Sequence, residues 1–231
     1  MSGRRISYGD DPSQYGELFL PAGDPRGIVV VLHGGFWKAD YDAGLGRPLA
    51  ASLAEHGWAT WNLEYRRVGN GGGTPATFDD VAAGVDKLTD LGLDLTTVVT
   101  LGHSAGGHLA AWVAGHSGLV TGVIAQAGVL DLRAAYDEGL GGGAVEALLG
   151  HRPGPADERY DPVARAPLDL PVWCVHGTDD DDVPITQSES YVEASGGAAE
   201  LVRVDGDHFV VIDPTSAAWR QTLAILDRLT S

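Results

Sequence analysis

Residues 102–106 read Gly-His-Ser-Ala-Gly, which has the G-x-S-x-G spacing of a serine nucleophile. They follow an apolar, β-branched run at 97–101 and open a segment with the apolar spacing of a helix. A serine at such a strand–turn–helix junction needs small neighbours, and Gly102 and Gly106 supply them. We therefore predict that Ser104 is a nucleophile; the alternative is an ordinary serine in a glycine-rich turn.

Residues 33–37, His-Gly-Gly-Phe-Trp, follow another apolar run. Acyl transfer needs hydrogen-bond donors aimed at the oxyanion of the tetrahedral intermediate, and each donor is worth about 3 kcal/mol. Glycines after a strand leave backbone N–H groups unobstructed, so we assign an oxyanion hole to the amides of Gly35, Phe36 and Ala105. We expect His33 to hold this loop by hydrogen bonds. The alternative is a tight turn without a donor role.

A general base and its acid are expected later in the chain, in the order Ser, Asp, His. His208 follows the run at 200–204 and could take the serine proton and deliver it to the leaving group. A carboxylate would bind the other ring nitrogen and set the tautomer. Residues 179–182, after the run at 172–175, are four consecutive aspartates. Residue types alone do not choose among them, because most of an acidic run is a solvated loop.

Other side chains could line a substrate pocket. Trp37 and Phe209 adjoin the two loops that carry the chemistry. Arg66 follows a predicted strand and could bind a substrate carboxylate, although a structural ion pair with a nearby acid is the favoured interpretation. His103 could also line the pocket, and His108 is expected to pack beneath the serine turn.

The elements that must position these residues alternate along the chain. Apolar runs predict strands buried on both faces, at 27–32, 58–63, 97–101, 121–125, 172–175 and 200–204. Amphipathic spacing predicts helices over 45–56, 78–91, 105–115 and 214–229, with Thr77 as the N-cap of the second. This alternation predicts an α/β fold with a mostly parallel central sheet and helices on both faces. We expect one domain over residues 1–231, with a pocket-shaping insertion at 131–167 that holds a helical piece at 144–149.

Composition excludes several classes of protein. The 231 residues carry 15 basic and 32 acidic side chains, a formal charge of −17, which disfavours binding to nucleic acids and anionic lipids. Cys174 is the single cysteine, so no internal disulfide forms, and its apolar surroundings predict a buried thiol. No metal-ligand spacing such as H-E-x-x-H occurs, so we expect no metal and no cofactor.

No apolar run approaches the 18 residues of a membrane span. A cytoplasmic location is the default expectation, with a small-molecule substrate as the partner. The oligomeric state is left open, with a homodimer as one option.

Together, the motifs at 33–37, 102–107, 176–184 and 206–209 resemble those of the α/β-hydrolase superfamily. The H-G-G-x-W and G-H-S-A-G-G-H-L forms are similar to those of the arylformamidase (kynurenine formamidase) branch and of neighbouring hormone-sensitive-lipase-like esterases. This resemblance implies an α/β-hydrolase fold and a Ser-Asp-His triad. In its H-G-x-x-D-x-x-V-P pattern the acid falls on Asp180, with Asp179 as second choice and Asp182 as third. Phe36 stands where related motifs have a third glycine, which favours the formamidase-like branch.

The resemblance implies a serine hydrolase that cleaves a small carboxylic ester or amide through an acyl-enzyme. An arylformamidase-like amidase and a general carboxylesterase share this apparatus, so the triad does not separate them. A prolyl-oligopeptidase-type peptidase is the weakest of these enzyme hypotheses. An alternative of another class is a non-catalytic protein that binds a ligand on the hydrolase fold. The intact set of Ser, Asp and His argues against it.

Overall fold

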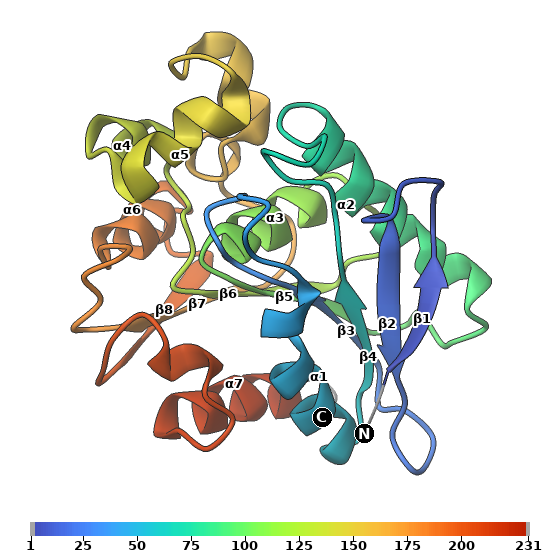
Figure 1. The fold of residues 1–231 in the computed structure, drawn as a ribbon. Coiled ribbons are helices and arrows are strands. Elements are labelled where there is room, and N and C mark those ends of the chain that lie inside the picture. Colours follow the sequence, from blue (N-terminus) through green and yellow to red (C-terminus); the bar gives the residue numbers. More distant parts are fainter. Residues whose placement is uncertain (1–2, 230–231) are drawn as a thin grey trace.

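The computed structural model describes residues 3–229, so both ends of the predicted domain of residues 1–231 lie outside the described range. In the described part, eight strands form one sheet in the order β1-β2-β4-β3-β5-β6-β7-β8 (Figure 1). β2 runs antiparallel to β1 and β4, and every pair from β4 to β8 is parallel. This is the predicted α/β-hydrolase fold. The strands are β1 (Arg4–Ser7), β2 (Tyr15–Phe19), β3 (Ile28–Leu32), β4 (Ala59–Leu63), β5 (Val98–His103), β6 (Gly122–Gln126), β7 (Val172–Gly177) and β8 (Ala199–Val204).

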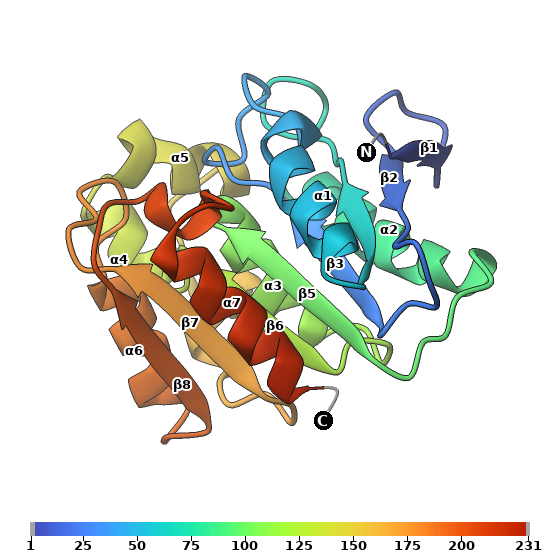
Figure 2. The ribbon, with the colours of Figure 1, turned by 90° about the horizontal axis from the view of Figure 1, so that it is seen from below.

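Helices cover both faces of the sheet. α1 and α7 lie on one face (Figure 2), where the indole N–H of Trp219 donates to Ser52 Oγ at 2.9 Å and joins them. α2, α3 and α6 lie on the other face (Figure 1). The predicted helices are all present, within a few residues of their expected ends. The helices are α1 (Arg47–Glu55), α2 (Ala76–Asp86), α3 (Ala105–Ala114), α4 (Leu132–Asp137), α5 (Leu140–Leu149), α6 (Thr186–Ala194) and α7 (Ala217–Arg228).

The predicted N-cap of α2 is wrong. The helix begins at Ala76, so Thr77 lies inside its first turn. The Thr77 hydroxyl donates to the backbone oxygen of Arg66 at 2.7 Å and accepts from the N–H of Gly73 at 2.9 Å. It therefore ties α2 to the segment after β4 instead of capping the helix.

Alternate side chains of β3 enter two apolar layers. Val29 and Val31 pack with residues of α1 and α7, whereas Val30 and Leu32 pack with residues of α2 and α3. Fully burying one such side chain contributes about 1.5–3 kcal/mol. Both faces of the central strands are buried, which explains their near-continuous apolar runs. Cys174 is also buried, which raises the pKa of its thiol to about 12 and leaves it unreactive.

The segment at 131–167 contains α4, α5 and two short 3-10 helices, Pro155–Tyr160 and Val163–Arg165. Positive φ angles at Gly141, Gly142 and Gly143 interrupt α5, so its regular part matches the helical piece predicted at 144–149. None of the described helices combines the length and apolar character needed to cross a bilayer.

Candidate active site

Ser104 occupies a strained turn between β5 and α3. Its φ of 56° and ψ of −120° lie in a region that side chains other than glycine rarely adopt, and its N–H donates to Gln126 O at 2.8 Å. A Cβ on Gly102 would stand 2.0 Å from Gly106 O, and a Cβ on Gly106 would stand 2.0 Å from Leu32 O. Both positions therefore require glycine, and the turn has the geometry of a nucleophile elbow.

Asp180 holds His208 in a defined orientation. Nδ1 of His208 donates to Oδ2 of Asp180 at 2.7 Å, and the exposed fractions of these side chains are 5% and 0%. Because Nδ1 is committed to the carboxylate, Nε2 is the nitrogen left to accept a proton. Ser104 and His208 line the same pocket. The arrangement suits proton transfer from a serine to a histidine.

The Asp180 carboxylate has several donors. Besides His208, it accepts hydrogen bonds from His176 Nε2 at 3.2 Å and from the backbone N–H groups of Val183 at 2.8 Å and Asp182 at 3.0 Å. Burial by itself would raise the pKa of Asp180. The hydrogen bonds from His176, His208 and Val183 outweigh it and lower the pKa well below its ordinary value. Asp180 is therefore charged at neutral pH.

Among the four adjacent aspartates, Asp180 is the one whose carboxylate is bonded to His208 within the described residues. Asp179, Asp181 and Asp182 are exposed. Asp182 lies at the pocket, and the other two belong to a solvated loop. The geometry thus favours the acid that the family resemblance implied.

Two further histidines support this site. Nε2 of His103 donates to the backbone oxygen of His208 at 2.9 Å, and His103 lines the pocket. Burial, with the nearby His208, lowers the pKa of His103 to about 3, so its ring is neutral. His176 accepts from Ser188 Oγ at 2.8 Å while bonding Asp180. We assigned His176 no role from the sequence; its signal was its position at the start of the H-G-x-x-D pattern.

The loop after β3 lies against the nucleophile. A Cβ on Gly34 would stand 2.9 Å from His103 O and 3.1 Å from Ser104 Cβ. Within residues 3–229, the N–H groups of Gly35, Phe36 and Ala105 donate to no protein acceptor. They are therefore available to an oxyanion, as the predicted hole requires.

A pocket of about 160 Å³ opens at Ser104. Its walls are mostly apolar, and Tyr41, Leu45 and Phe209 form an exposed rim. Among the described residues, Asp182 is the one carboxylate in the wall, and no lysine or arginine lines it. The lining residues are Gly35, Phe36, Tyr41, Leu45, His103, Ser104, Asp182, His208, Phe209 and Ile212.

The family model that matches this sequence is BD-FAE, over residues 17–194, which is more than half of the 231 residues. The chain belongs to the BD-FAE family. The matched range includes Ser104 and Asp180 and ends before His208. As a BD-FAE protein, it is an esterase-like serine hydrolase with the α/β-hydrolase fold. No curated protein matches its sequence.

Solved structures similar to this BD-FAE protein include several esterases. A truncated carbohydrate esterase from gut microbiota has a TM-score of 0.81 at 18% identity, covering 100% of this chain and 96% of that chain. Esterase B from Lactobacillus rhamnosis, with a tributyrin phosphonate, has a TM-score of 0.81 at 21% identity, covering 100% and 85%. A thermophilic esterase from Thermogutta terrifontis has a TM-score of 0.77 at 23% identity, covering 98% and 90%. At these identities the likeness shows the fold.

Two of the predicted substrate-binding residues lie outside the pocket of this BD-FAE protein. Trp37 is buried, and its ring contacts that of His108 at 5.1 Å between centroids, in the core beneath the loop. Arg66 binds the buried carboxylate of Asp80 through Nε at 2.8 Å and a terminal nitrogen at 2.7 Å. Neither side chain lines the pocket among the described residues, and Arg66 forms the ion pair with a nearby acid that was the favoured interpretation. Phe209 does line the pocket.

The insertion at 131–167 contributes no side chain to the lining of this pocket within the described residues. It reaches the BD-FAE active site indirectly. Lys38 Nζ donates to Gly141 O at 2.7 Å, and a Cβ on Gly141 would stand 2.6 Å from the Phe36 ring. That the insertion shapes the pocket stays a prediction. It would act through Phe36, which lines the pocket and packs against Gly141.

Proposed function

We propose that this BD-FAE protein is a carboxylesterase that hydrolyses small neutral esters through an acyl-enzyme on Ser104. The observation that carries the proposal is one pocket lined by a serine in a nucleophile elbow and by a histidine that Asp180 orients at 2.7 Å. The esterases among the structural neighbours support the same chemistry.

The geometry supports a two-step reaction. Nε2 of His208 takes the Ser104 proton as Oγ attacks the ester carbonyl, and the free N–H groups of Gly35, Phe36 and Ala105 bind the resulting oxyanion. The imidazolium then protonates the leaving alcohol as the acyl-enzyme forms. Water, deprotonated by His208, attacks the acyl group, and the carbonyl re-forms as the carboxylic acid leaves and Oγ regains its proton. Asp180 stabilises the imidazolium in both steps.

Pocket size and charge support the substrate class. A volume of about 160 Å³ with apolar walls suits a short acyl or alcohol group. Asp182 in the wall repels carboxylates, and Arg66, the cation that the sequence suggested for a substrate carboxylate, is occupied by Asp80. An amino-acid formamide such as N-formylkynurenine carries a carboxylate that this lining offers no cation to bind. A neutral ester therefore fits better than the arylformamidase substrate.

A paired assay tests the proposal. The purified enzyme and its Ser104→Ala variant are given p-nitrophenyl acetate and N-formylkynurenine, and kcat/KM is measured for both. We expect the ester to be cleaved at about 10⁴ M⁻¹s⁻¹ or faster, the lower end of ordinary enzyme efficiency, and the formamide at least about tenfold more slowly. The opposite preference would favour the arylformamidase. No turnover of either substrate would favour a non-catalytic ligand-binding protein. A cytoplasmic location and a homodimer stay predictions from the sequence.

A further inference from the structure

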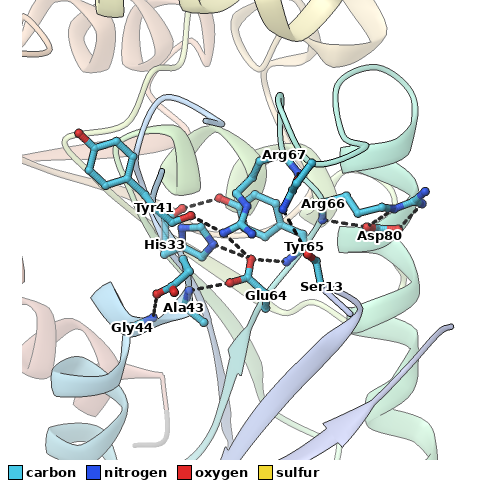
Figure 3. A network of polar contacts seen from close by, with 12 residues as sticks. Ser13, His33, Tyr41, Ala43, Gly44, Glu64, Tyr65, Arg66, Arg67 and Asp80 are labelled. Carbon is cyan, nitrogen blue, oxygen red and sulfur yellow. Dashed lines mark hydrogen bonds and ion pairs between the residues drawn. The ribbon is translucent and has the colours of Figure 1, made fainter. Parts of the chain in front are cut away.

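Glu64 lies directly behind the loop that carries the oxyanion hole. The parallel register of β3 and β4 pairs Leu32 with Leu63, so the next residues, His33 and Glu64, leave the sheet side by side. The Glu64 side chain is 2% exposed and forms the centre of a polar network (Figure 3). A buried carboxylate of this kind is stable only when its oxygens have partners.

The Glu64 carboxylate holds both ends of the segment at 33–43. At one end, Nε2 of His33 lies 3.2 Å from Oε1. At the other end, the N–H of Ala43 donates to Oε2 at 2.9 Å. Gly35 and Phe36, the predicted oxyanion donors, lie between these two contacts in the chain.

Two neighbours extend this clamp. A guanidinium nitrogen of Arg67 lies 2.9 Å from Glu64 Oε1 and also donates to the backbone oxygen of Tyr41, inside the same segment. The Tyr65 hydroxyl donates to His33 O at 2.7 Å, and its ring stacks on His33 with centroids 4.5 Å apart. Burial, with Glu64 beside it, raises the pKa of Tyr65, so the hydroxyl keeps the proton it donates.

The clamped segment is strained. Gly35, Phe36 and Trp37 have φ angles of 109°, 50° and 56°. A positive φ costs a non-glycine residue about 1–2 kcal/mol and persists only where the surroundings enforce it. Donors that stabilise an oxyanion must be held in place before the charge develops. The network around Glu64 supplies that restraint.

We infer that Glu64 is a positioning residue for the oxyanion hole, a buried carboxylate that clamps both ends of the segment at 33–43 and thereby aims the N–H groups of Gly35 and Phe36. This inference rests on the proposed esterase function. Glu64 acts through the loop and touches no reacting atom.

The test compares Glu64→Gln with Asp80→Asn. Glutamine keeps the shape of the side chain, but its NH₂ group accepts no hydrogen bond, so it cannot accept both from the N–H of Ala43, which binds Oε2, and from the N–H of Tyr65, which binds Oε1. Asp80 is a matched control because it is also a buried carboxylate, pairs with Arg66 next to Arg67, and has no hydrogen bond to the segment at 33–43 among the described residues. The substrates are p-nitrophenyl acetate and its thiono analogue, whose C=S sulfur accepts hydrogen bonds poorly and therefore gains little from an oxyanion hole.

For Glu64→Gln we expect kcat for the oxygen ester to fall roughly 10- to 100-fold, less than the ~10²–10³-fold cost of deleting a donor, with KM changing by less than about twofold. The ratio of oxygen-ester to thionoester turnover should fall with it. Asp80→Asn should leave this ratio at the wild-type value. A variant that is merely less stable would lose both activities equally, and an unchanged ratio in Glu64→Gln would overturn the inference.

Tyr65→Phe keeps the inference testable if Glu64→Gln does not fold, because it deletes only the donor to His33 O. We expect it to lower the same ratio roughly three- to tenfold, consistent with the loss of about one hydrogen bond. An unchanged ratio would again contradict the clamp. If the wild-type enzyme cleaves neither ester, the proposed function fails, which is distinguishable from failure of the clamp alone.

Discussion

Two buried carboxylates each contact a histidine of the active-site region: Asp180 binds His208, and Glu64 lies beside His33. Both follow strands of the parallel part of the sheet, and both bind backbone N–H groups as well as a histidine. They differ in permanent charge, because Glu64 is paired with Arg67, whereas the partners of Asp180 among the described residues are histidines and backbone amides. A carboxylate without a fixed cation can stabilise an imidazolium that forms during the reaction. A carboxylate whose charge is already neutralised by an arginine is suited to a structural role, which here is to hold the segment at 33–43 in place.

The largest expected effect is the loss of turnover when Asp180 is replaced. Asp180→Asn should lower kcat for p-nitrophenyl acetate by about 10⁴-fold, because an amide that donates to Nδ1 favours the wrong tautomer of His208. Asp179→Asn should change kcat by less than about twofold, since that side chain is exposed and has no bond to His208 in the described structure. If Asp179→Asn lost most of its turnover while Asp180→Asn kept its activity, Asp179 would be the catalytic acid instead.

The next effect distinguishes Glu64 from the catalytic acid Asp180 by the free energy of unfolding that each contributes. Glu64→Gln should lower the free energy of unfolding by about 3–5 kcal/mol, because it leaves the buried Arg67 without its counter-charge. Asp180→Asn leaves no permanent cation without a counter-charge. Its free energy of unfolding should therefore fall by only ~1–3 kcal/mol, the cost of unsatisfied buried hydrogen-bonding groups. Urea unfolding at pH 7 measures both variants. Equal losses would remove the distinction between the two carboxylates.

Asp161 extends the comparison to a carboxylate that bonds neither a cation nor a histidine in the described residues. It accepts from Leu132 N–H at 3.1 Å, and burial, with Asp131 nearby, raises its pKa to about 6. Its folded-state pKa exceeds its unfolded value of about 3.9, so the stability linked to its protonation is complete below about pH 4 and is lost as pH rises through 6.

Replacing Asp161 should therefore stabilise the protein at high pH. We expect Asp161→Asn to be about 1–3 kcal/mol more stable than the wild type at pH 8, with the difference closing toward pH 4. Asparagine can still accept the hydrogen bond from Leu132. Urea unfolding at both pH values measures this, and a difference that grows on acidification would show that burial does not dominate at this site.

The smallest effect is expected at Asp182, an exposed carboxylate in the pocket wall. Asp182→Asn should raise kcat/KM for mono-p-nitrophenyl succinate about two- to fivefold relative to neutral p-nitrophenyl butyrate, because it removes a like charge worth less than ~1 kcal/mol. The gain should shrink in 1 M salt, where the Debye length is about 3 Å. A gain that persists in 1 M salt would point to shape instead of charge.

The sheet and its helices were predictable because strands buried on both faces give near-continuous apolar runs. β1 and β2 escaped prediction. β1 has an edge position and an exposed Arg-Arg-Ile-Ser sequence, while β2 mixes Gly16 and Glu17 with its apolar residues. The serine and histidine of the site followed from motifs. The acid needed a family resemblance, because four aspartates are equivalent by residue type and only folding brings one of them to His208.

Other parts of the site depend on contacts that residue types do not specify. Trp37 follows His-Gly-Gly and suits a pocket or a core equally; its contact with His108, 71 residues away, places it in the core. Glu64 lies 31 residues from His33, and only the register of β3 and β4 brings the two together. Such roles become visible once strand pairing is known.

The proposed reaction depends on Ser104 as the nucleophile that His208 activates. The most direct measurement treats the wild-type protein and Ser104→Ala with a p-nitrophenyl alkylphosphonate, then determines the adduct by intact and peptide mass spectrometry. We expect one adduct per chain on the peptide that contains Ser104, loss of esterase activity in step with labelling, and no adduct in Ser104→Ala. An adduct on another residue, or a Ser104→Ala variant that keeps its turnover, would contradict it.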